Sequence, residues 1–423
     1  MGNLTDLISE KTETEIAIEK YWKTRGDAEP ARGYLGASSI GAACSRQLWY
    51  SFRKCSTPNF SGRLYRLFNR GHREEPTFVE ELRGIGCDVH EFDSEGNQFE
   101  VIACEGHFKG HTDGAALGVP EAPKTWHLLE MKTASAKSFR STKKHGCEKD
   151  KPQHFAQMQV YMHLTGLKRA LYMVVNKDTD EVYTERLRHN SKQAQVYIDK
   201  AEMIINSTEP PERISEKNDY YLCKFCDARD LCHGLSEVAV PIPALNCRQC
   251  VHSTAVQDGK WHCDKLGSET DGTPCDQHLL IPALVGFAEP TDSFVNQKDG
   301  SNVIEFTTED GTIFHHGSDF EKGQFNSKML LTTPKSLVSL PNLRRSGVQF
   351  NLESKYQLSN EGVESVWKGR IEDVKNQFQQ SYSVPLSNPD ATQEGEGWTI
   401  AEFKELCCII NYGGKYAEIR EIK

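Results

Sequence analysis

The sequence lacks several features that would each mark a class of protein. No apolar run reaches the roughly eighteen residues that a membrane-spanning helix needs. The first residues do not combine a basic start with an apolar stretch, so no secretory signal peptide is predicted. A P-loop (GxxxxGKS/T) is missing, as is a nucleotide fingerprint of flavin or nicotinamide enzymes. We therefore expect a protein of the cytoplasm, or of the host cytoplasm if its source is viral, with no membrane partner.

The sequence also has fewer basic than acidic residues, and its formal net charge is −10. Taken alone, this argues weakly against nucleic acid as a partner, since nucleic acids favour basic surfaces. The basic residues are nevertheless grouped, and local groups can bind phosphates on an acidic protein. A solvated charged face would explain either group equally well. The two groups are Arg63, Arg66, Arg70 and Arg73, and Lys132, Lys137, Arg140, Lys143, Lys144, Lys149 and Lys151.

The length of 423 residues, with 37% hydrophobic and 26% charged residues, predicts a globular protein of two or three domains. Residues 1–30 are expected to form a helix and a linker. Residues 31–235 are expected to form the main domain, and residues 236–290 a cysteine-rich module. The C-terminal region, 291–423, carries no motif and is expected to be α+β.

The main domain shows an α/β order of elements, with helices and strands that alternate. A break or a kink at Gly71 and Pro76 is expected in the first long helix, and residues 135–151 are expected to form a charged loop. Farther along, Asp310-Gly311 predicts a hairpin within 303–316, and residues 398–412 are expected to be helical. The elements expected in the main domain are a helix at 62–84, strands at 99–104, 107–117 and 126–133, a helix at 152–165, a hairpin at 169–188 and a helix at 191–206.

Acidic and basic side chains of one strand predict a catalytic site. Glu130 and Lys132 are two residues apart on an apolar strand, so their side chains share a face. A hairpin would bring Asp113, on the preceding strand, beside Glu130. Two carboxylates and the carbonyl of Met131 form a hard oxygen site for Mg²⁺ or Mn²⁺, and Lys132 would position the attacking water or neutralise developing charge. Alone, such a pattern is also explained by a surface ion pair.

Three more residues strengthen this hypothesis by their order along the chain. His72 lies on the earlier helix, and an imidazole added to a carboxylate site favours Mn²⁺ over Mg²⁺. Gln157 and Tyr161 are four residues apart on the later helix, so they share a face and could contact DNA or hold Lys132.

The order His72, GHTDG (110–114), EMK (130–132) and QMQVY (157–161) resembles the RecB-type branch of the PD-(D/E)XK nucleases. The resemblance covers about residues 36–235. It implies a restriction-endonuclease-like α/β core and a Mg²⁺- or Mn²⁺-dependent DNase, often an exonuclease of recombination or repair.

A first cysteine group surrounds these motifs. Cys223, Cys226 and Cys232 follow a C-x2-C-x5-C pattern, and three thiolates need a fourth ligand, for which Cys44 is the candidate. The spacing alone leaves zinc and an iron–sulfur cluster open. The split arrangement resembles the [4Fe–4S] staple of some RecB-type nucleases, including the AddAB helicase-nuclease and the CRISPR adaptation nucleases, and so implies that cluster.

A second cysteine group, Cys247, Cys250, Cys263 and Cys275, lies within about thirty residues and predicts a tetrahedral Zn²⁺ site. His252, His262 and His278 are spare candidate ligands. Unligated thiols in a small subdomain are the alternative interpretation.

The leading hypothesis is a DNA exonuclease that acts on single-stranded or duplex ends in recombination, repair or phage replication. An annealing protein, a single-strand binding protein or a helicase would be its partner, because the chain carries no helicase motif. The alternatives are a non-catalytic DNA- or protein-binding protein that keeps the nuclease fold, and an iron–sulfur redox protein.

Overall fold

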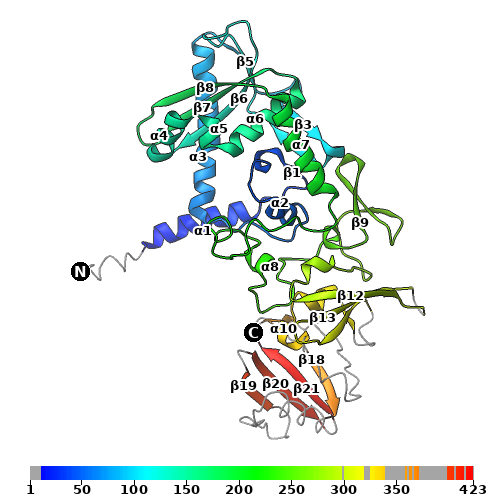
Figure 1. Ribbon diagram of the computed structural model, residues 1–423. Coiled ribbons are helices and arrows are strands. Elements are labelled where there is room, and N and C mark those ends of the chain that lie inside the picture. Colours follow the sequence, from blue (N-terminus) through cyan, green and yellow to red (C-terminus); the bar gives the residue numbers. More distant parts are fainter. Residues whose placement is uncertain are drawn as a thin grey trace. The chain divides into compact units, whose positions relative to one another are not determined.

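The protein is described by a computed structural model (Figure 1). It describes residues 11–297, 300–318, 324–338, 358–359, 362–363, 366–370, 398–403, 406–413 and 416–422. The chain forms two compact units, each continuous except for one short exchange: Met1–Ser215 with Thr254–His262, and Glu216–Ser253 with Cys263–Lys423. The domain limits expected at 235 and 290 remain a prediction.

The first unit is built on a five-stranded mixed sheet in the order β2-β5-β6-β7-β8. The central pair, β6 and β7, is parallel, and the outer strands are antiparallel to their neighbours. A smaller sheet has the order β1-β4-β3. The strands are β1 Leu35–Gly36, β2 Asp88–His90, β3 Glu100–Ala103, β4 Phe108–His111, β5 Ala115–Leu117, β6 His127–Ala134, β7 Arg169–Asn176 and β8 Val182–Arg188.

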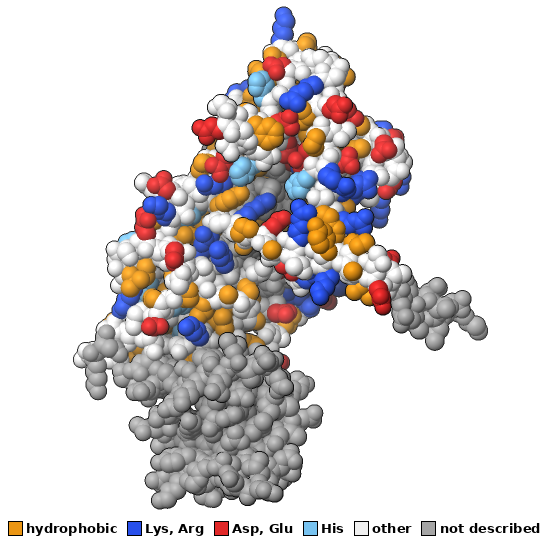
Figure 2. All heavy atoms as spheres, turned by 180° about the vertical axis from the view of Figure 1, so that it is seen from behind, with side chains coloured by type: hydrophobic (Ala, Val, Ile, Leu, Met, Phe, Trp, Pro, Cys, Tyr) orange, Lys and Arg blue, Asp and Glu red, His pale blue; other side chains and the backbone are white. Residues whose placement is uncertain are grey.

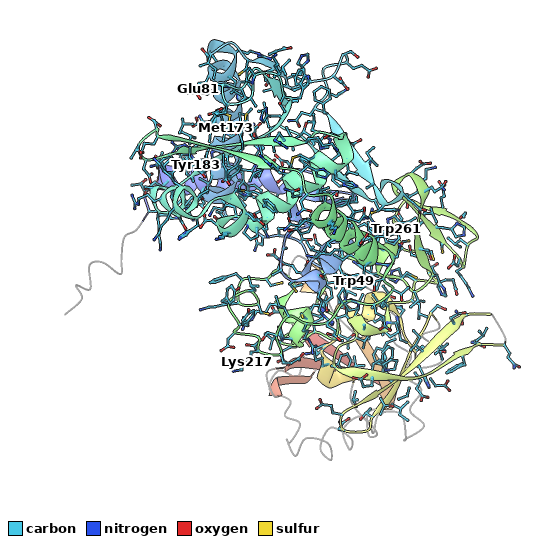
Figure 3. All side chains as sticks on the ribbon, turned by 45° about the horizontal axis from the view of Figure 1, so that its top comes forward. Trp49, Glu81, Met173, Tyr183, Lys217 and Trp261 are labelled. Atoms are coloured by element: carbon cyan, nitrogen blue, oxygen red, sulfur yellow. The ribbon has the colours of Figure 1, made fainter. Side chains whose placement is uncertain are left out.

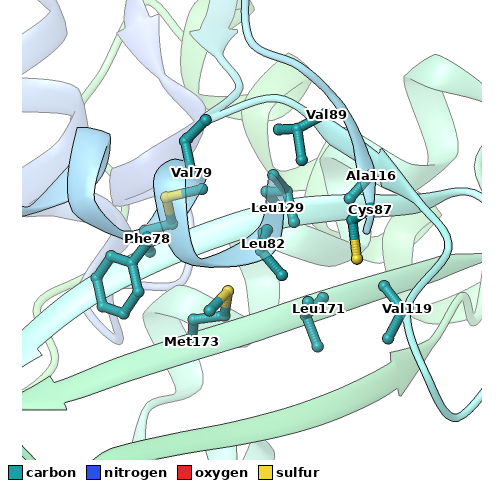
Figure 4. Packing of buried hydrophobic residues seen from close by; sticks show 11 residues of the cluster. Phe78, Val79, Leu82, Cys87, Val89, Ala116, Val119, Leu129, Leu171 and Met173 are labelled. Atoms are coloured by element: carbon teal, nitrogen blue, oxygen red, sulfur yellow. The ribbon is translucent and has the colours of Figure 1, made fainter. Parts of the chain in front are cut away.

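Helices cover both faces of the five-stranded sheet. Helix α3 (Gly62–Gly84) buries Phe78, Val79 and Leu82 against one face, and Figure 4 shows these side chains beside those of the sheet. Burial of this apolar cluster is the main force that holds α3 in place. Helix α6 (Pro152–Thr165) covers the opposite face, where Gln157 reaches Glu130. Because side chains alternate along a strand, Met131 faces the α3 cluster while Glu130 faces α6.

The remaining helices of this unit complete the α/β layers. Helix α1 (Glu13–Asp27) begins with a capping box at Thr12 and Glu15. Helix α2 (Ser45–Phe52) buries Trp49, and Arg53 lies over the rings of both Trp49 and Trp261, which are labelled in Figure 3. The others are α4 Ala136–His145, α5 Cys147–Asp150 and α7 Ser191–Asn206.

Several predicted elements are confirmed. Helix α6 begins at Pro152, a position at which the backbone N–H has no partner within the helix, so proline loses no hydrogen bond there. The helix ends before Gly166, which adopts the left-handed backbone conformation. The hairpin β7–β8 and helix α7 lie where they were expected.

Three predictions about this unit were wrong. The strand expected at 107–117 is divided into β4 and β5, which belong to different sheets, and Asp113 lies between them rather than on a strand. Helix α3 continues through Gly71 and Pro76 without a break. Pro76 is exposed, so the carbonyl of His72 that loses its helical partner can bond water instead. Residues 135–151 form helices α4 and α5 rather than a loop. Ser135 caps α4, and Phe139 is buried against the unit, which explains why this charged segment is ordered.

The second unit contains a four-stranded sheet in the order β12-β13-β14-β15, with stacked Phe306 and Phe314 in its core. The predicted hairpin at 303–316 is confirmed as β13–β14. Residues 398–412 were predicted to be helical, and this is wrong, because they lie in strands β19 and β20 of a sheet in the order β18-β21-β20-β19. Ile, Thr, Trp and Tyr in this segment suit a strand better than a helix.

The Cys-rich and C-terminal parts contain α8 Arg229–His233, β9 Ser253–Val256, β10 Lys260–Cys263, β11 Ser268–Thr270, β12 Ala288–Val295, β13 Asn302–Thr308, β14 Ile313–His316, β15 Gln324–Phe325, α9 Ser327–Leu330, α10 Lys335–Val338, β16 Leu358–Ser359, β17 Gly362–Val363, β18 Val366–Arg370, β19 Trp398–Phe403, β20 Leu406–Gly413 and β21 Tyr416–Ile422. Among the described residues, no helix has both the length and the apolar character to cross a membrane.

Candidate active site

Asp113 and Gly114 lie between β4 and β5, and each accepts one hydrogen bond from the backbone of β6. The backbone N–H of Leu129 donates to the carbonyl of Gly114 at 2.9 Å, and the N–H of Met131 donates to Asp113 Oδ2 at 2.7 Å. Gly114 has a φ of 121°, a conformation that favours glycine and turns the chain directly after Asp113. The GHTDG segment therefore sets the carboxylate of Asp113 beside the strand that carries Glu130.

The ammonium of Lys132, on β6, lies among three oxygens. Its Nζ lies 2.5 Å from Glu130 Oε1, 3.1 Å from the carbonyl oxygen of Met131 and 3.8 Å from Asp113 Oδ2. Glu130 is fully buried, whereas the Lys132 side chain is 29% exposed, so the site opens to solvent on the lysine side. The arrangement brings together the three residues of the predicted metal site and the predicted lysine.

The electrostatics of this group favour a cation. Burial raises the pKa of Glu130 to about 7, Lys132 opposes this, and the charge of Asp113 adds to it. Burial lowers the pKa of Lys132, but Glu130 and Asp113 outweigh burial, and its pKa lies above the ordinary value. Three acidic side chains (Asp113, Glu130 and Glu75) thus interact with one ammonium, so acidic groups outnumber basic groups at the site.

Gln157 and Tyr161 approach the site from α6. Gln157 Nε2 donates a hydrogen bond to Glu130 Oε2 at 2.9 Å, and Gln157 also hydrogen-bonds Tyr161. Burial, followed by the charges of Glu130 and Asp113, raises the pKa of Tyr161. The Tyr161 hydroxyl packs directly against Gly110, where any side chain would collide with it. Gln157 contacts Glu130 rather than Lys132, so its contact fixes a carboxylate of the site.

His72 sits on α3, but its imidazole is 75% exposed and its ion-pair partner is Glu75, with Nδ1 and Oε1 3.3 Å apart. Glu75 is the α3 residue whose charge couples to Asp113, Glu130 and Lys132. Burial, and then the charge of Asp113, raises the pKa of Glu75. Sequence reasoning missed Glu75. Its position one turn after His72, on the buried side of an amphipathic helix, was the available signal.

His154 is a second residue that sequence reasoning missed. It lies one turn before Gln157 on α6, and its Nδ1 is 2.8 Å from the hydroxyl of Tyr172, the β7 residue that pairs with Glu130. Burial, and then the charges of Lys132 and Lys151, lowers the pKa of His154 to about 4. The imidazole is therefore neutral at physiological pH. The helical spacing of His154, Gln157 and Tyr161 was the signal for it.

The donor set fits a hard divalent cation. It consists of two carboxylates, a backbone carbonyl and the nearby carboxylate of Glu75, all oxygen donors. Among these oxygens, the ammonium of Lys132 supplies the positive charge that a metal ion would supply. In the described part of the chain, no three His, Cys, Asp or Glu side chains are already arranged as ligands of a metal ion. The residues that would hold such an ion are Asp113, Glu130 and the carbonyl of Met131.

The cysteines of the first group belong to different units, with Cys44 in the first and the other three in the second. Cys44 occupies the N-cap position of α2 without a side-chain capping hydrogen bond. The loop before it is held by Lys200, whose Nζ donates to the carbonyls of Ile40 and Ala42 at 2.9 and 2.6 Å. In the second unit, the N–H of Cys226 donates to the carbonyl of Cys223 at 3.0 Å, which forms a tight turn. The ligand set that joins Cys44, Cys223, Cys226 and Cys232 remains a prediction from spacing.

The second cysteine group lies within the second unit. Cys247 and Cys250 sit in one turn, Cys263 ends β10, and Cys275 follows β11. Of the spare histidines, His278 has both ring nitrogens engaged, Nδ1 with Ser327 Oγ at 2.8 Å and Nε2 with the carbonyl of Asn246 at 3.1 Å.

No protein family and no curated protein matches the sequence. Among solved structures, the chain is similar to SSO0001, with a TM-score of 0.33 and 14% identity over 53% of this chain and 97% of that one. It is also similar to LHK-Exo in complex with dAMP, with a TM-score of 0.32 and 16% identity, covering 44% of this chain and 90% of the other. A further similarity, with a TM-score of 0.29 and 17% identity over 44% and 90% of the two chains, is to an alkaline exonuclease (LHK-Exo) from Laribacter hongkongensis. At these low scores, the function has to be argued from the chain's own residues.

Proposed function

We propose that the protein is a metal-dependent DNA nuclease with a PD-(D/E)XK core of the RecB type, and that it degrades DNA from its ends. The observation that carries the proposal is the position of Lys132, whose ammonium touches Glu130 and Met131 and approaches Asp113. A cation among these oxygens is what phosphodiester hydrolysis at a carboxylate site requires.

Asp113, Glu130 and the carbonyl of Met131 would hold Mg²⁺ or Mn²⁺, with Glu75 beside them and His72 acting on the site only through Glu75. When bound, the metal would supply charge to the phosphate and lower the pKa of an attacking water. Lys132, whose side chain is 29% exposed, could orient the water or offset charge on the phosphate. Gln157 would keep Glu130 in one orientation by holding Oε2.

Helix α4 offers a basic surface directly after the strand that carries Glu130 and Lys132. Its buried side contains Phe139 and Thr142, and its exposed side contains Lys137, Arg140 and Lys144 at helical spacing. On the face drawn in Figure 2, basic, acidic and apolar side chains are interspersed, so phosphate binding rests on local groups such as this one. We infer that α4 contacts the DNA backbone without regard to sequence.

The cofactor of the first cysteine group is part of the same proposal. Cys44, Cys223, Cys226 and Cys232 would bind a [4Fe–4S] cluster that ties the start of the nuclease core to its end. Closing so long a loop restricts the unfolded chain, which favours a stapling role. An annealing protein, a single-strand binding protein or a helicase would supply or receive the DNA end.

The test is hydrolysis by the purified full chain with Mn²⁺ or Mg²⁺. Substrates are end-labelled single-stranded and duplex DNA and a covalently closed circle. We expect linear DNA to be degraded, the circle to survive and a chelator to stop the reaction. Cleavage of the circle at the same rate would overturn the exonuclease assignment. Tight DNA binding without any hydrolysis would favour the non-catalytic alternative.

A further inference from the structure

Backbone N–H groups from outside the turn that carries Cys247 and Cys250 are directed at the sulfur of Cys250. The N–H of Leu279 donates to Cys250 Sγ at 3.3 Å, and the backbone N–H of His252 donates to the same sulfur. A neutral thiol is a weak acceptor, whereas a thiolate gains from amide donors as other anions do. Two N–H groups on one buried sulfur therefore suit a thiolate, and thiolates are the form in which cysteine binds metals.

Backbone hydrogen bonds fold the other two cysteines back onto this turn. The N–H of Asp264, next to Cys263, donates to the carbonyl of His252 at 2.9 Å. The N–H of Cys247 donates to the carbonyl of Gly272 at 3.0 Å, and Cys247 Sγ lies 3.0 Å from the carbonyl of Thr273, two residues before Cys275. Two chain segments that are distant in sequence thus converge on one short turn.

The electrostatic neighbours of these sulfurs agree with the backbone geometry. Burial raises the pKa of Cys247, and the charges of Cys275 and Cys263 raise it further. Burial also raises the pKa of Cys250 to about 11, with smaller contributions from Cys247 and Cys263. The mutual interactions of Cys247 with Cys263 and Cys275, and of Cys250 with Cys247 and Cys263, agree with the close approach that the backbone hydrogen bonds describe.

We propose that Cys247, Cys250, Cys263 and Cys275 bind one structural Zn²⁺ ion. The four proposed ligands are soft sulfur donors. His278, the histidine closest in sequence to Cys275, has both ring nitrogens engaged elsewhere. Among the described residues, no three such side chains are already arranged as ligands of a metal ion, so the four cysteines would have to rearrange when the ion binds. The ion would hold segment 246–280, which consists of short strands and turns.

The site does not depend on the proposed nuclease chemistry, and the experiment keeps the two apart. Zinc and iron are measured by elemental analysis in purified full-length protein and in three variants. We expect about one zinc per chain in the wild type and in Lys132→Ala. The double variant Cys250→Ser/Cys263→Ser should lose the zinc, whereas Cys104→Ser, a half-exposed cysteine outside both groups, should keep it.

X-ray absorption at the zinc edge of the wild-type protein gives a measurement that does not rely on the folding of any variant. Four sulfur ligands at about 2.3 Å are expected. Cobalt substituted for zinc should give the visible absorption of a tetrahedral thiolate site. Zinc that persists in the double variant, a wild type that takes up no zinc when the metal is supplied, or oxygen and nitrogen ligands in the absorption spectrum would each overturn the proposal.

Discussion

The ammonium of Lys132 lies 2.5 Å from Oε1 of Glu130, while Oε2 of the same carboxylate accepts a hydrogen bond from Gln157. Each oxygen of this fully buried carboxylate therefore has a partner, one from its own strand and one from α6. The ammonium of Lys132 lies beside the carboxylates of Glu130 and Asp113, where a divalent cation would bind.

Replacement of Lys132 by alanine should make the protein dependent on metal for stability. Without the ammonium, the buried carboxylate of Glu130 faces Asp113 unpaired, which should cost roughly 3 kcal/mol in the free energy of unfolding. Mn²⁺ should recover most of this loss in Lys132→Ala and stabilise the wild type less. The measurement is chemical unfolding with chelator and with Mn²⁺, with exposed Lys149→Ala as the control. An equal loss in both conditions would contradict this role for Lys132.

Glu75 should matter more than His72. Glu75→Gln removes a negative charge that couples to Asp113 and Lys132, so we expect DNA cleavage to fall roughly 10–100-fold and Mn²⁺ binding to weaken. His72→Ala should change cleavage little, because its imidazole is 75% exposed. Glu74→Gln, next in sequence and paired with Arg70, is the matched control. A larger loss in His72→Ala than in Glu75→Gln would restore His72 as a direct ligand.

The sequence predicts the strand and helix positions of the site well, because they follow from local patterns. Pro152 and Gly166 mark both ends of α6, and the spacing of Glu130 and Lys132 places both side chains on one face. The contacts between elements were less predictable. That Gln157 holds Glu130, and that Glu75 rather than His72 approaches the site, depends on how α3 and α6 are rotated against the sheet.

Other errors arose where local preference and tertiary packing disagree. The run of lysines at 135–151 suggested a loop, but Phe139 anchors it as helix α4. Pro76 suggested a break in α3, yet the cluster of Phe78, Val79 and Leu82 holds the helix together. Burial of apolar side chains outweighs the cost of one missing backbone hydrogen bond.

Replacements of two glutamines on α6, Gln157 and Gln159, should distinguish an effect on the cleavage rate from an effect on the free energy of unfolding. Gln157→Ala frees Oε2 of Glu130, so we expect cleavage to fall at least 10-fold with a modest change in stability. Gln159 instead donates to the carbonyl of Arg188 and accepts from the N–H of Asn190. Its replacement by alanine should cost about 1–3 kcal/mol in stability but leave the rate of the folded enzyme near that of the wild type. Single-turnover rates and unfolding curves test both, and a reversed pattern would refute the assignment.

The second unit should be acid-sensitive through His316. This imidazole is fully buried, accepts from the N–H of Leu280 at 2.9 Å and donates to the carbonyl of Phe325 at 2.7 Å, and burial lowers its pKa to about 4. The unfolded chain binds a proton near pH 6.5, whereas the folded one does not until about pH 4. Stability should therefore be full above pH 6.5 and decline as the pH falls towards 4, by up to about 3 kcal/mol.

The His316 prediction is measured as the free energy of unfolding between pH 7.5 and 4.5. His316→Asn keeps a donor for Phe325 but cannot take up a proton. Although less stable at neutral pH, it should lose less stability on acidification than the wild type. Parallel slopes for the two proteins would show that His316 does not titrate in this way.

The most direct test of the central claim is single-turnover hydrolysis of linear DNA with Mn²⁺ by wild type, Lys132→Ala and Asp113→Asn. DNA binding is measured in parallel in Ca²⁺. The account predicts that both variants bind DNA but cleave it at least about 100-fold more slowly than the wild type. Equal cleavage by all three proteins would mean that Asp113, Glu130 and Lys132 do not form the site of a nuclease.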